Sequence, residues 1–294
     1  MRPEDSDPFE GERARLTRLA YRMLGSVAEA EDVVQSAWLR WQAADRASVG
    51  VPGAFLSRIV TRLCLDAMKS ARARREVYVG AWLPEPYLDR AEAMPDDDDL
   101  TLTLMMALER LSPLERAAFL LHDVFGVPLD EVAVTLGRAA PATRQLAVRA
   151  RRHVRAERPR YRLGPEEGER IARAFFAAAQ SGDVAALRGL LSDDVTIRAD
   201  GGGKVIAVLN PIAGIERVLR LFAGLARKYA AAPAAFLRPV RVDGLPGYVS
   251  LERGGVLQVT ALDIRDGRVA GIYITRNPDK LRHVAGPPDA PTAA

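Results

Sequence analysis

The sequence predicts a multi-domain fold in which two all-α domains are followed by an α+β domain. Three observations indicate this organisation. Apolar residues recur at helical spacing through residues 13–76 and again through 100–157. Prolines near residues 82–86 and 159–165 interrupt the helical pattern. Beyond residue 190, short β-branched runs alternate with one further helix, which is typical of an α+β domain.

The first helical domain is expected to contain three helices. Apolar residues share one face of the first helix, and Gly25 ends it. Ser26, followed three residues later by Glu29, matches a capping box and starts a second helix that runs to about Trp41. After a loop over residues 45–53, a third helix is expected from about Ala54 to Arg75.

The second helical domain has the layout of a helix-turn-helix. Ser112, Pro113 and Glu115 combine an N-cap, a proline at the first helical position and a capping-box acid. The chain breaks at residues 125–128, and a short helix follows from about Leu129 to Leu136. Gly137 ends this helix, and a last helix extends over residues 141–155.

One face of that last helix is almost entirely cationic or hydrogen-bonding. At 100° per residue, an arc of about 160° contains the following side chains: Arg144, Gln145, Val148, Arg149, Arg151, Arg152 and Arg155. Residues 138–162 contain nine arginines and one acidic residue, Glu157. A solvated amphipathic helix is the alternative interpretation, but the shortage of local acidic partners favours DNA binding.

Position along this helix assigns different roles to its polar residues. Arg144 and Gln145 lie near the helix N-terminus, where they are expected to reach base edges in the major groove. Phosphate contacts, which give affinity rather than sequence choice, are expected from the arginines that follow. These are Arg149, Arg151, Arg152 and Arg155.

The last 130 residues predict the α+β domain. Helices are expected over residues 166–180, 183–191 and 215–229. Strand-like runs cover residues 195–198, 205–209, 236–242, 248–252, 256–264 and 269–275, giving a mostly antiparallel sheet. Residues 265–268, Arg-Asp-Gly-Arg, form a good hairpin turn between the last two strands.

Composition excludes several classes of function. A single cysteine, Cys64, rules out a disulfide framework and a cysteine-based metal site, and suits a reducing cytoplasm. The three histidines are far apart in the sequence, so no metal site or cofactor is expected. The net charge of +4 argues against a general nucleic-acid coat protein. No signal peptide or membrane-spanning run is present, which predicts a cytoplasmic protein without membrane contact.

Residues 21–41 resemble region 2.2 of the sigma factors that direct bacterial RNA polymerase to promoters. In that family, this helix docks on the clamp helices of the β′ subunit. The resemblance implies that Glu31, Asp32 and Gln35 contact the polymerase.

The third helix resembles regions 2.3 and 2.4, which melt and read the −10 element, and loop 45–52 is the expected pocket for a flipped base. Residues 61–64, Thr-Arg-Leu-Cys, depart from the family pattern, where an asparagine is common. A basic cluster ends this helix: Lys69, Arg72, Arg74 and Arg75. It is expected to contact DNA near the melted element, although cations are also favourable at a helix C-terminus.

Residues 111–154 resemble sigma region 4, which binds the −35 element. The motif over residues 137–147 is similar to that of a subgroup of extracytoplasmic-function sigma factors whose C-terminus carries a SnoaL-like, NTF2-type domain. Three further segments match this subgroup. They are Trp82-Leu83-Pro84-Glu85-Pro86, Asp200-Gly201-Gly202-Gly203-Lys204 and Asn277-Pro278-Asp279-Lys280-Leu281. The resemblance implies regulation within one chain, with the last two segments contacting the linker or the sigma core and setting the spacing of its domains.

Together these interpretations predict a sigma factor whose partners are promoter DNA and the β′ clamp helices and β flap of core polymerase. A small molecule is a further candidate ligand for the C-terminal domain. Expected boundaries are 1–80 for region 2, 81–98 for the linker, 99–160 for region 4, 161–286 for the SnoaL-like domain and 287–294 for a disordered tail.

Two alternatives remain open at this stage. The first is a one-component helix-turn-helix regulator with a ligand-binding domain, which leaves residues 21–41 without a function. The second is an NTF2-type isomerase or cyclase fused to a DNA-binding region. Its formal catalytic candidates are Asp193, Asp194, Asp200 and Asp263. No acid–base pair can be placed among them, so no catalytic residue and no enzymatic activity are expected.

Overall fold

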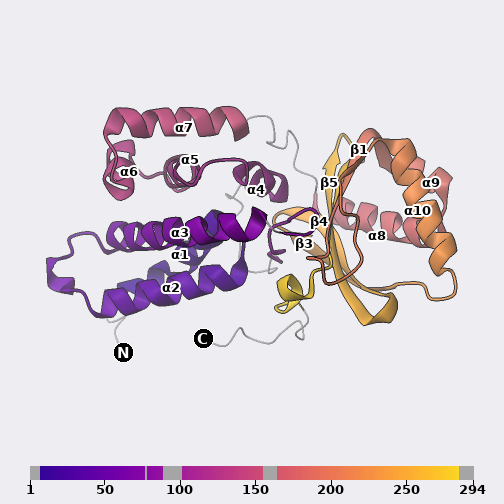
Figure 1. The fold of residues 1–294 in the computed structure, drawn as a ribbon, viewed down its shortest axis with the longest axis horizontal. Helices are drawn as coiled ribbons and strands as arrows, with labels where there is room; N and C mark the ends of the chain where they lie inside the picture. The colour runs from indigo at the N-terminus through magenta and orange to yellow at the C-terminus, as the bar shows by residue number, and fades with distance from the viewer. Residues whose placement is uncertain (1–6, 77, 89–100, 155–163, 285–294) are drawn as a thin grey trace. The chain divides into compact units, whose positions relative to one another are not determined.

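A computed structural model describes residues 7–76, 78–88, 101–154 and 164–284, apart from the side chains of 70–76. The chain divides into two compact units, and Figure 1 shows helices in the first and a sheet with helices in the second. The first unit comprises Met1–Glu76 and Leu104–Arg158, and the second comprises Val77–Thr103 and Pro159–Ala294. Both predicted helical domains therefore lie in one unit, whereas the segment that connects them belongs to the other.

Three helices form the N-terminal part of the first unit: α1 (Pro8–Leu24), α2 (Val27–Gln42) and α3 (Pro52–Glu76). The predicted stop and start signals are confirmed. Gly25 adopts the left-handed conformation with φ of 71°, and the Ser26 side chain accepts a hydrogen bond from the Glu29 amide. The loop after α2 contains a 3₁₀ turn, η2 (Arg46–Ser48), and α3 begins two residues before the predicted start.

The remainder of the first unit contains α4 (Leu102–Leu108, shared with the second unit), α5 (Pro113–Phe119), α6 (Leu129–Leu136) and α7 (Ala140–Val154). The predicted capping box is present, with Ser112 and Glu115 each bonded to the other's backbone. Helix α5 continues as a π-helical turn, η3 (Leu120–Val124). Gly137 has φ of 62° and separates α6 from α7, as a helix-turn-helix requires.

A buried arginine ties the two helical parts of this unit together. The Arg116 side chain is 1% exposed and its Nε donates to the backbone carbonyl of Arg22 over 2.8 Å. Its Nη1 lies 2.5 Å from the carboxylate of Glu109. A buried charge is retained only when it is paired and hydrogen-bonded, so these contacts fix α5 against the end of α1.

The second unit is built on one six-stranded sheet with strand order β2-β1-β6-β5-β4-β3. Its strands are β1 (Leu191–Asp200), β2 (Ile212–Ala213), β3 (Ala235–Val242), β4 (Leu245–Glu252), β5 (Val256–Arg265) and β6 (Arg268–Thr275). The accompanying helices are α8 (Pro165–Ser181), α9 (Val184–Leu190), α10 (Ile215–Tyr229) and the 3₁₀ turns η5 (Arg253–Gly255) and η6 (Pro278–Leu281). This is the predicted α+β domain.

One strand prediction is wrong, whereas the predicted mostly antiparallel sheet is confirmed. Residues 205–209 form no strand, since they follow a turn and leave Ile206 83% exposed. Strands β1 and β6 pair in parallel, whereas the other pairs in the sheet are antiparallel. Instead of residues 205–209, the two-residue strand β2 pairs with β1.

Each face of the sheet has its own apolar core. The helix-covered face packs Leu262 and Ile272 against Phe175 of α8 and Phe222 of α10. The other face buries Val249, Val259 and Ala261 beneath residues that lie outside the sheet. These covering residues are Leu88, Leu102, Leu281 and Val284. The connecting segment therefore contributes directly to the second core.

Candidate functional site

The last helix of the predicted helix-turn-helix, α7, has one buried apolar face and one exposed polar face, as predicted. Its inner face is buried through Leu146, Ala147, Ala150 and Val154. Of the residues predicted to contact DNA, Arg144, Gln145, Arg149 and Arg152 are exposed. The positions of these side chains suit insertion of the helix into the major groove. Arg155 lies outside the described residues.

Acidic partners from other elements reach three of these arginines. Arg149 Nε lies 2.9 Å from the Glu115 carboxylate, and Arg151 Nε lies 2.6 Å from Asp123 on η3. Arg144 makes a longer contact, 3.7 Å, with the exposed carboxylate of Asp130. These carboxylates come from other elements of the fold, so the shortage of acidic residues in the neighbouring sequence did not predict them.

The ion pair at Glu115 has an electrostatic consequence. Burial acts to raise the pKa of Glu115, but hydrogen bonds from Ser112 and the charge of Arg149 outweigh it, so the pKa lies below its ordinary value. Glu115 is therefore a carboxylate at neutral pH and forms an ion pair with Arg149 that joins α5 to α7.

The predicted polymerase-binding residues share the exposed side of α2. Glu31, Asp32 and Gln35 are exposed, whereas Val34 and Ala37 are buried. On α3, Lys69 is exposed and pairs with Asp66 over 2.8 Å. Arg72, Arg74 and Arg75 lie on the same helix, but their side chains are outside the described part of the chain.

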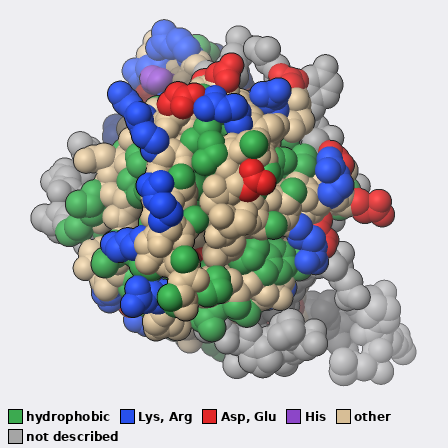
Figure 2. All heavy atoms as spheres, turned by 90° about the vertical axis from the view of Figure 1, so that its right-hand side faces the viewer, with side chains coloured by type: hydrophobic (Ala, Val, Ile, Leu, Met, Phe, Trp, Pro, Cys, Tyr) green, Lys and Arg blue, Asp and Glu red, His purple; other side chains and the backbone are tan. Residues whose placement is uncertain are grey.

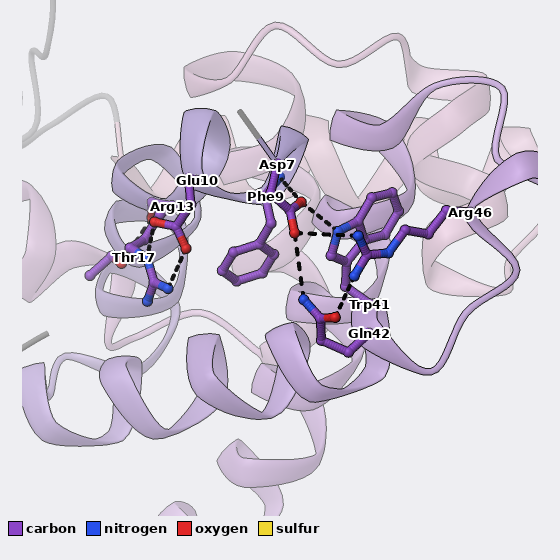
Figure 3. Close-up of polar contacts among 8 residues, drawn as sticks. All are labelled: Asp7, Phe9, Glu10, Arg13, Thr17, Trp41, Gln42 and Arg46. Carbon is purple, nitrogen blue, oxygen red and sulfur yellow. Dashed lines mark hydrogen bonds and ion pairs between the residues drawn. The ribbon is translucent and has the colours of Figure 1, made fainter. Parts of the chain in front are cut away.

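Asp7 anchors the loop that follows α2, as Figure 3 shows. Its carboxylate accepts hydrogen bonds from the Phe9 amide at 3.0 Å and from Trp41 Nε1 at 2.8 Å. The Arg46 guanidinium reaches the same carboxylate at 3.4 Å and lies over the Trp41 ring. The backbone hydrogen bond from Phe9 is the largest of several effects that lower the pKa of Asp7. These contacts fix one end of loop 45–52, the predicted base pocket.

In the second unit, the Asp200 and Lys280 motifs meet the connecting segment. Asp200 is fully buried, and its carboxylate accepts hydrogen bonds from the Tyr78 hydroxyl at 2.5 Å and the Leu83 amide at 2.9 Å. Lys280 Nζ lies 2.8 Å from the same carboxylate and also donates to the Leu83 carbonyl. The ammonium lies 4.2 Å from the ring centroid of Trp82. We call this cluster (Tyr78, Trp82, Leu83, Asp200 and Lys280) the linker clasp.

Asn277 and the glycines of the 200–204 motif shape the clasp. Asn277 Nδ2 donates to the Tyr78 hydroxyl over 2.8 Å, and the backbone amide of Asn277 donates to the backbone carbonyl of Asp200. A Cβ on Gly202 would lie 2.3 Å from Asn277 Nδ2, and one on Gly201 would lie 2.3 Å from the Val205 carbonyl. Gly201 is required because the Val205 backbone approaches so closely, and Gly202 because the Asn277 side chain approaches closely at a φ of 61° that other residues rarely adopt.

The rest of the two motifs lies at the edge of the clasp. A Cβ on Gly203 would lie 3.2 Å from Val79, and Lys204 forms an exposed ion pair with Asp279. Pro278 begins η6, and Leu281 is buried in the second core. Burial is the main reason that the pKa of Tyr78 is raised, with the Asp200 carboxylate adding to it, so the hydroxyl keeps its proton and donates.

Further contacts continue along the connecting segment. His283 Nε2 lies 2.8 Å from the Pro86 carbonyl, and Leu88 forms a β-bridge with Val242. Beyond the undescribed residues 89–100, the Leu102 amide donates to the Asp243 carbonyl. Both ends of the segment that joins the helical domains are thus bound to the second unit.

The structure offers little for the catalytic alternative. Asp193 and Asp194 are exposed on β1, and Asp200 is occupied by the clasp. Asp263 is buried, and its carboxylate lies 2.8 Å from Arg265. The described residues include no group of three or more acidic, histidine or cysteine side chains able to hold a metal. Among the same residues, no helix has the length and hydropathy of a membrane span.

Comparison with known proteins identifies relatives of both units. Residues 9–74 match the family Sigma-70 region 2, and residues 101–154 match Sigma-70, region 4. The chain is 40% identical over 292 residues to the ECF RNA polymerase sigma factor SigJ of Mycobacterium tuberculosis, covering 93% of this chain and 92% of that protein. Identity to SigI of the same species is 33% over 282 residues, covering 94% of each chain.

A solved structure extends this similarity to the fold. The crystal structure of the Mycobacterium tuberculosis extracytoplasmic function sigma factor SigJ matches with a TM-score of 0.75 at 35% identity. The match covers 93% of this chain and 96% of that one, so it includes the helical unit, the connecting segment and the sheet.

Proposed function

Because this chain belongs to the extracytoplasmic-function family of RNA polymerase sigma factors, we propose roles in initiation for its exposed helical faces and for the linker clasp. The chain directs core polymerase to promoters. The one-component regulator is not favoured, since that alternative gives α2 no partner. The observation that carries the rest of the proposal is the buried Asp200–Lys280 pair, which binds the segment between the two sigma domains.

Promoter contacts are assigned to α7. Arg144 and Gln145, exposed near its N-terminus, read bases of the −35 element, and Arg149 and Arg152 bind phosphate. The basic end of α3 contacts DNA near the −10 element. In vitro transcription with core polymerase and a genomic fragment library tests this. Exchanging Arg144 for alanine should change which sites initiate, whereas Arg152 to alanine should weaken all sites together.

The polymerase contact is assigned to α2. Its exposed polar residues Glu31, Asp32 and Gln35 lie opposite a buried apolar face, so they can bind the β′ clamp helices without unfolding the domain. By analogy with other sigma factors, region 4 of this chain is assigned a contact with the β flap of core polymerase. Charge reversal at Asp32 should weaken binding of the full chain to core polymerase. Charge reversal at Glu10, which is exposed on α1, serves as the control.

Regulation within the chain is assigned to the linker clasp. Residues 78–88 and 101–102 are bound to the second unit, so that unit holds both ends of the connection between the sigma domains. The spacing that the domains can adopt on a promoter then depends on whether the clasp is closed. This replaces the separate inhibitory protein that other sigma factors use.

Transcription with altered clasp segments tests this regulation. Replacing residues 200–204, or removing the chain from Asn277 onward, should change transcript yield from core polymerase while the start sites stay the same. Unchanged yield in both variants would refute regulation through the clasp. A change of start sites would instead place the second unit in promoter reading.

The small-molecule ligand expected from the sequence gains no support from the described side chains. On the helix-covered face of the sheet, Phe175, Phe222 and Tyr248 are buried in the core. Phe176 packs edge-to-face against Tyr248 with ring centroids 5.2 Å apart, and Phe236 packs against the same ring at 5.7 Å in a tilted arrangement. Aromatic side chains therefore pack together on the helix-covered face of the sheet.

A further inference from the structure

Helix α10 exposes a row of cations that the proposed function does not use. Its inner side is buried through Ile215, Val218, Leu219 and Phe222. At 100° per residue, an arc of about 100° on the outer side contains four basic residues. They are Arg217, Arg220, Arg227 and Lys228, and all four are exposed. We call this row the α10 basic face.

Among the described residues, no carboxylate forms an ion pair with the α10 basic face, although the charge of Arg220 helps to lower the pKa of Glu216. The only acidic residue of α10, Glu216, pairs with Arg188 of α9 over 2.7 Å. By contrast, the exposed arginines of α8, Arg170 and Arg173, each pair with a glutamate of the same helix. Figure 2 shows a column of Lys and Arg side chains on this side of the second unit, separated by hydrophobic and uncharged groups.

A glycine lies in the middle of the α10 basic face. Helical geometry puts Gly224 between the two pairs of cations, and a Cβ there would meet nothing within 4 Å. Glycine inside a helix costs about 1 kcal/mol relative to alanine, and the inner packing does not require it here. What the missing side chain provides is a flat gap where another surface can approach the helix backbone.

A fifth cation extends this surface beyond the helix. Arg253, on the η5 turn, lies over the ring of Tyr229 at 5.6 Å, and Lys228 lies over the same ring at 5.3 Å. Both cations therefore lie close to the Tyr229 ring at the C-terminal end of α10. The positive surface therefore involves two elements of the fold rather than one helix alone.

We propose that the α10 basic face binds the phosphate backbone of duplex DNA while the helical unit engages the promoter. From Arg217 to Lys228 the helix rises about 16 Å, which matches about five phosphates of one strand. The row contains cations and a gap but no amide side chain for base edges, so the contact is independent of sequence.

Duplex DNA is the polyanion that the established activity brings to the α10 basic face. Promoter recognition brings the whole chain to duplex DNA, so a tethered basic surface meets phosphate at high effective concentration. An acidic protein surface and an anionic membrane are other polyanions, and the experiment below distinguishes each of them from duplex DNA.

This proposal does not depend on the linker clasp, because the α10 basic face contains no clasp residue.

The first test places one negative charge inside the α10 basic face. Holoenzyme reconstituted from core polymerase and the full chain carries Gly224→Glu, and its affinity for promoter duplex is measured against salt concentration. The slope of log affinity against log salt should fall by about one for each phosphate that the helix no longer neutralises. Gly189→Glu is the matched control, since Gly189 lies on the exposed side of α9 with equally open space.

A second pair of variants guards against a folding defect. The double variant Arg217→Gln, Arg227→Gln should lower the slope of log affinity against log salt by about two. The double variant with lysine at both positions should keep the slope of the natural chain. The ion-paired Arg170→Gln with Arg173→Gln should leave the slope unchanged. The double glutamine variant should lower the salt slope by the same amount on a promoter whose flanking bases are scrambled.

Three results would overturn the proposal. One is an unchanged slope in both Gly224→Glu and the double glutamine variant. Another is weaker binding to core polymerase with an unchanged DNA slope, which would indicate an acidic protein partner. The last is loss of binding to phosphatidylserine vesicles with an unchanged DNA slope, which would indicate a membrane surface.

Discussion

Replacing Lys280 with methionine should release the connecting segment from the second unit. The substitution removes the ammonium but keeps an unbranched side chain of similar length. Lys280 is 7% exposed and Asp200 is fully buried, so the variant leaves an unpaired buried carboxylate. Removing one partner of a buried ion pair costs about 3–5 kcal/mol. The lower end applies, since Asp200 keeps hydrogen bonds from Tyr78, Leu83 and Gly202.

The expected size of the effect can be measured at one amide. A cost of about 3 kcal/mol raises the population of the open clasp more than 100-fold, at about 1.4 kcal/mol for each factor of ten. The Leu83 amide, which donates to Asp200, reports this opening through its hydrogen-exchange rate. In Lys280→Met the amide should exchange more than 100-fold faster than in the natural sequence.

The matched control is Lys204→Met. Lys204 joins the same two motifs through Asp279, but this pair is about half exposed, and neither side chain forms a hydrogen bond or ion pair with the described linker residues 78–88. An exposed pair contributes about 0.2–1 kcal/mol, so Leu83 exchange should change by less than about sixfold. Equal exchange in the natural protein and Lys280→Met would show that the buried ion pair does not hold the clasp closed, as would equal acceleration by both variants.

Three further predictions follow from single contacts. Gly202→Ala should also accelerate hydrogen exchange at the Leu83 amide, because the φ of 61° at position 202 is strained for alanine and the alanine Cβ would collide with Asn277. Exchange at the rate of the natural protein would contradict this geometry. The lowered pKa of Asp7 stabilises the fold above its unfolded pKa of about 4, and this contribution is lost as pH falls through the folded value. Acid unfolding of Asp7→Asn should therefore lack this component, and an unchanged pH profile would argue against it. Arg152→Gln should lower the salt slope of promoter binding by about one without lowering the melting temperature, whereas Arg151→Gln should lower the melting temperature because its pair with Asp123 is removed.

Local signals in the sequence were sufficient for most helices and for one hairpin. Ser26, Ser112 and Gly137 begin or end helices as predicted, because capping depends on residues within one turn. The turn at Asp266 and Gly267 has φ of 50° and 74°, which suits the predicted tight hairpin.

Features that depend on distant partners could not be predicted in this way. Residues 205–209 are β-branched and apolar but find no neighbouring strand, and the parallel pairing of β1 with β6 is set by the topology of the domain. The motifs around Asp200 and Lys280 were predicted to touch the linker or the sigma core. Their individual contacts, such as Lys280 against Trp82, join residues about two hundred positions apart and leave no local pattern.

The boundary of the C-terminal domain shows the same limit. Prolines in residues 82–86 correctly indicated a non-helical connection, and the sequence placed it in a separate linker over 81–98. In the structure, Leu83 is 1% exposed and residues 78–88 pack with the second unit. Burial of a proline-rich segment depends on the surface that covers it, which hydropathy along the chain does not reveal. The expected tail over 287–294 lies outside the described residues.

We propose that the linker clasp controls promoter-directed transcription. Its most direct test is the transcript yield of core polymerase supplied with the natural chain, Lys280→Met or Lys204→Met on one promoter. Lys280→Met should change the yield from an unchanged start site, and Lys204→Met should match the natural chain. If the Leu83 amide shows that the clasp has opened in Lys280→Met and the yield is still that of the natural chain, the claim is contradicted.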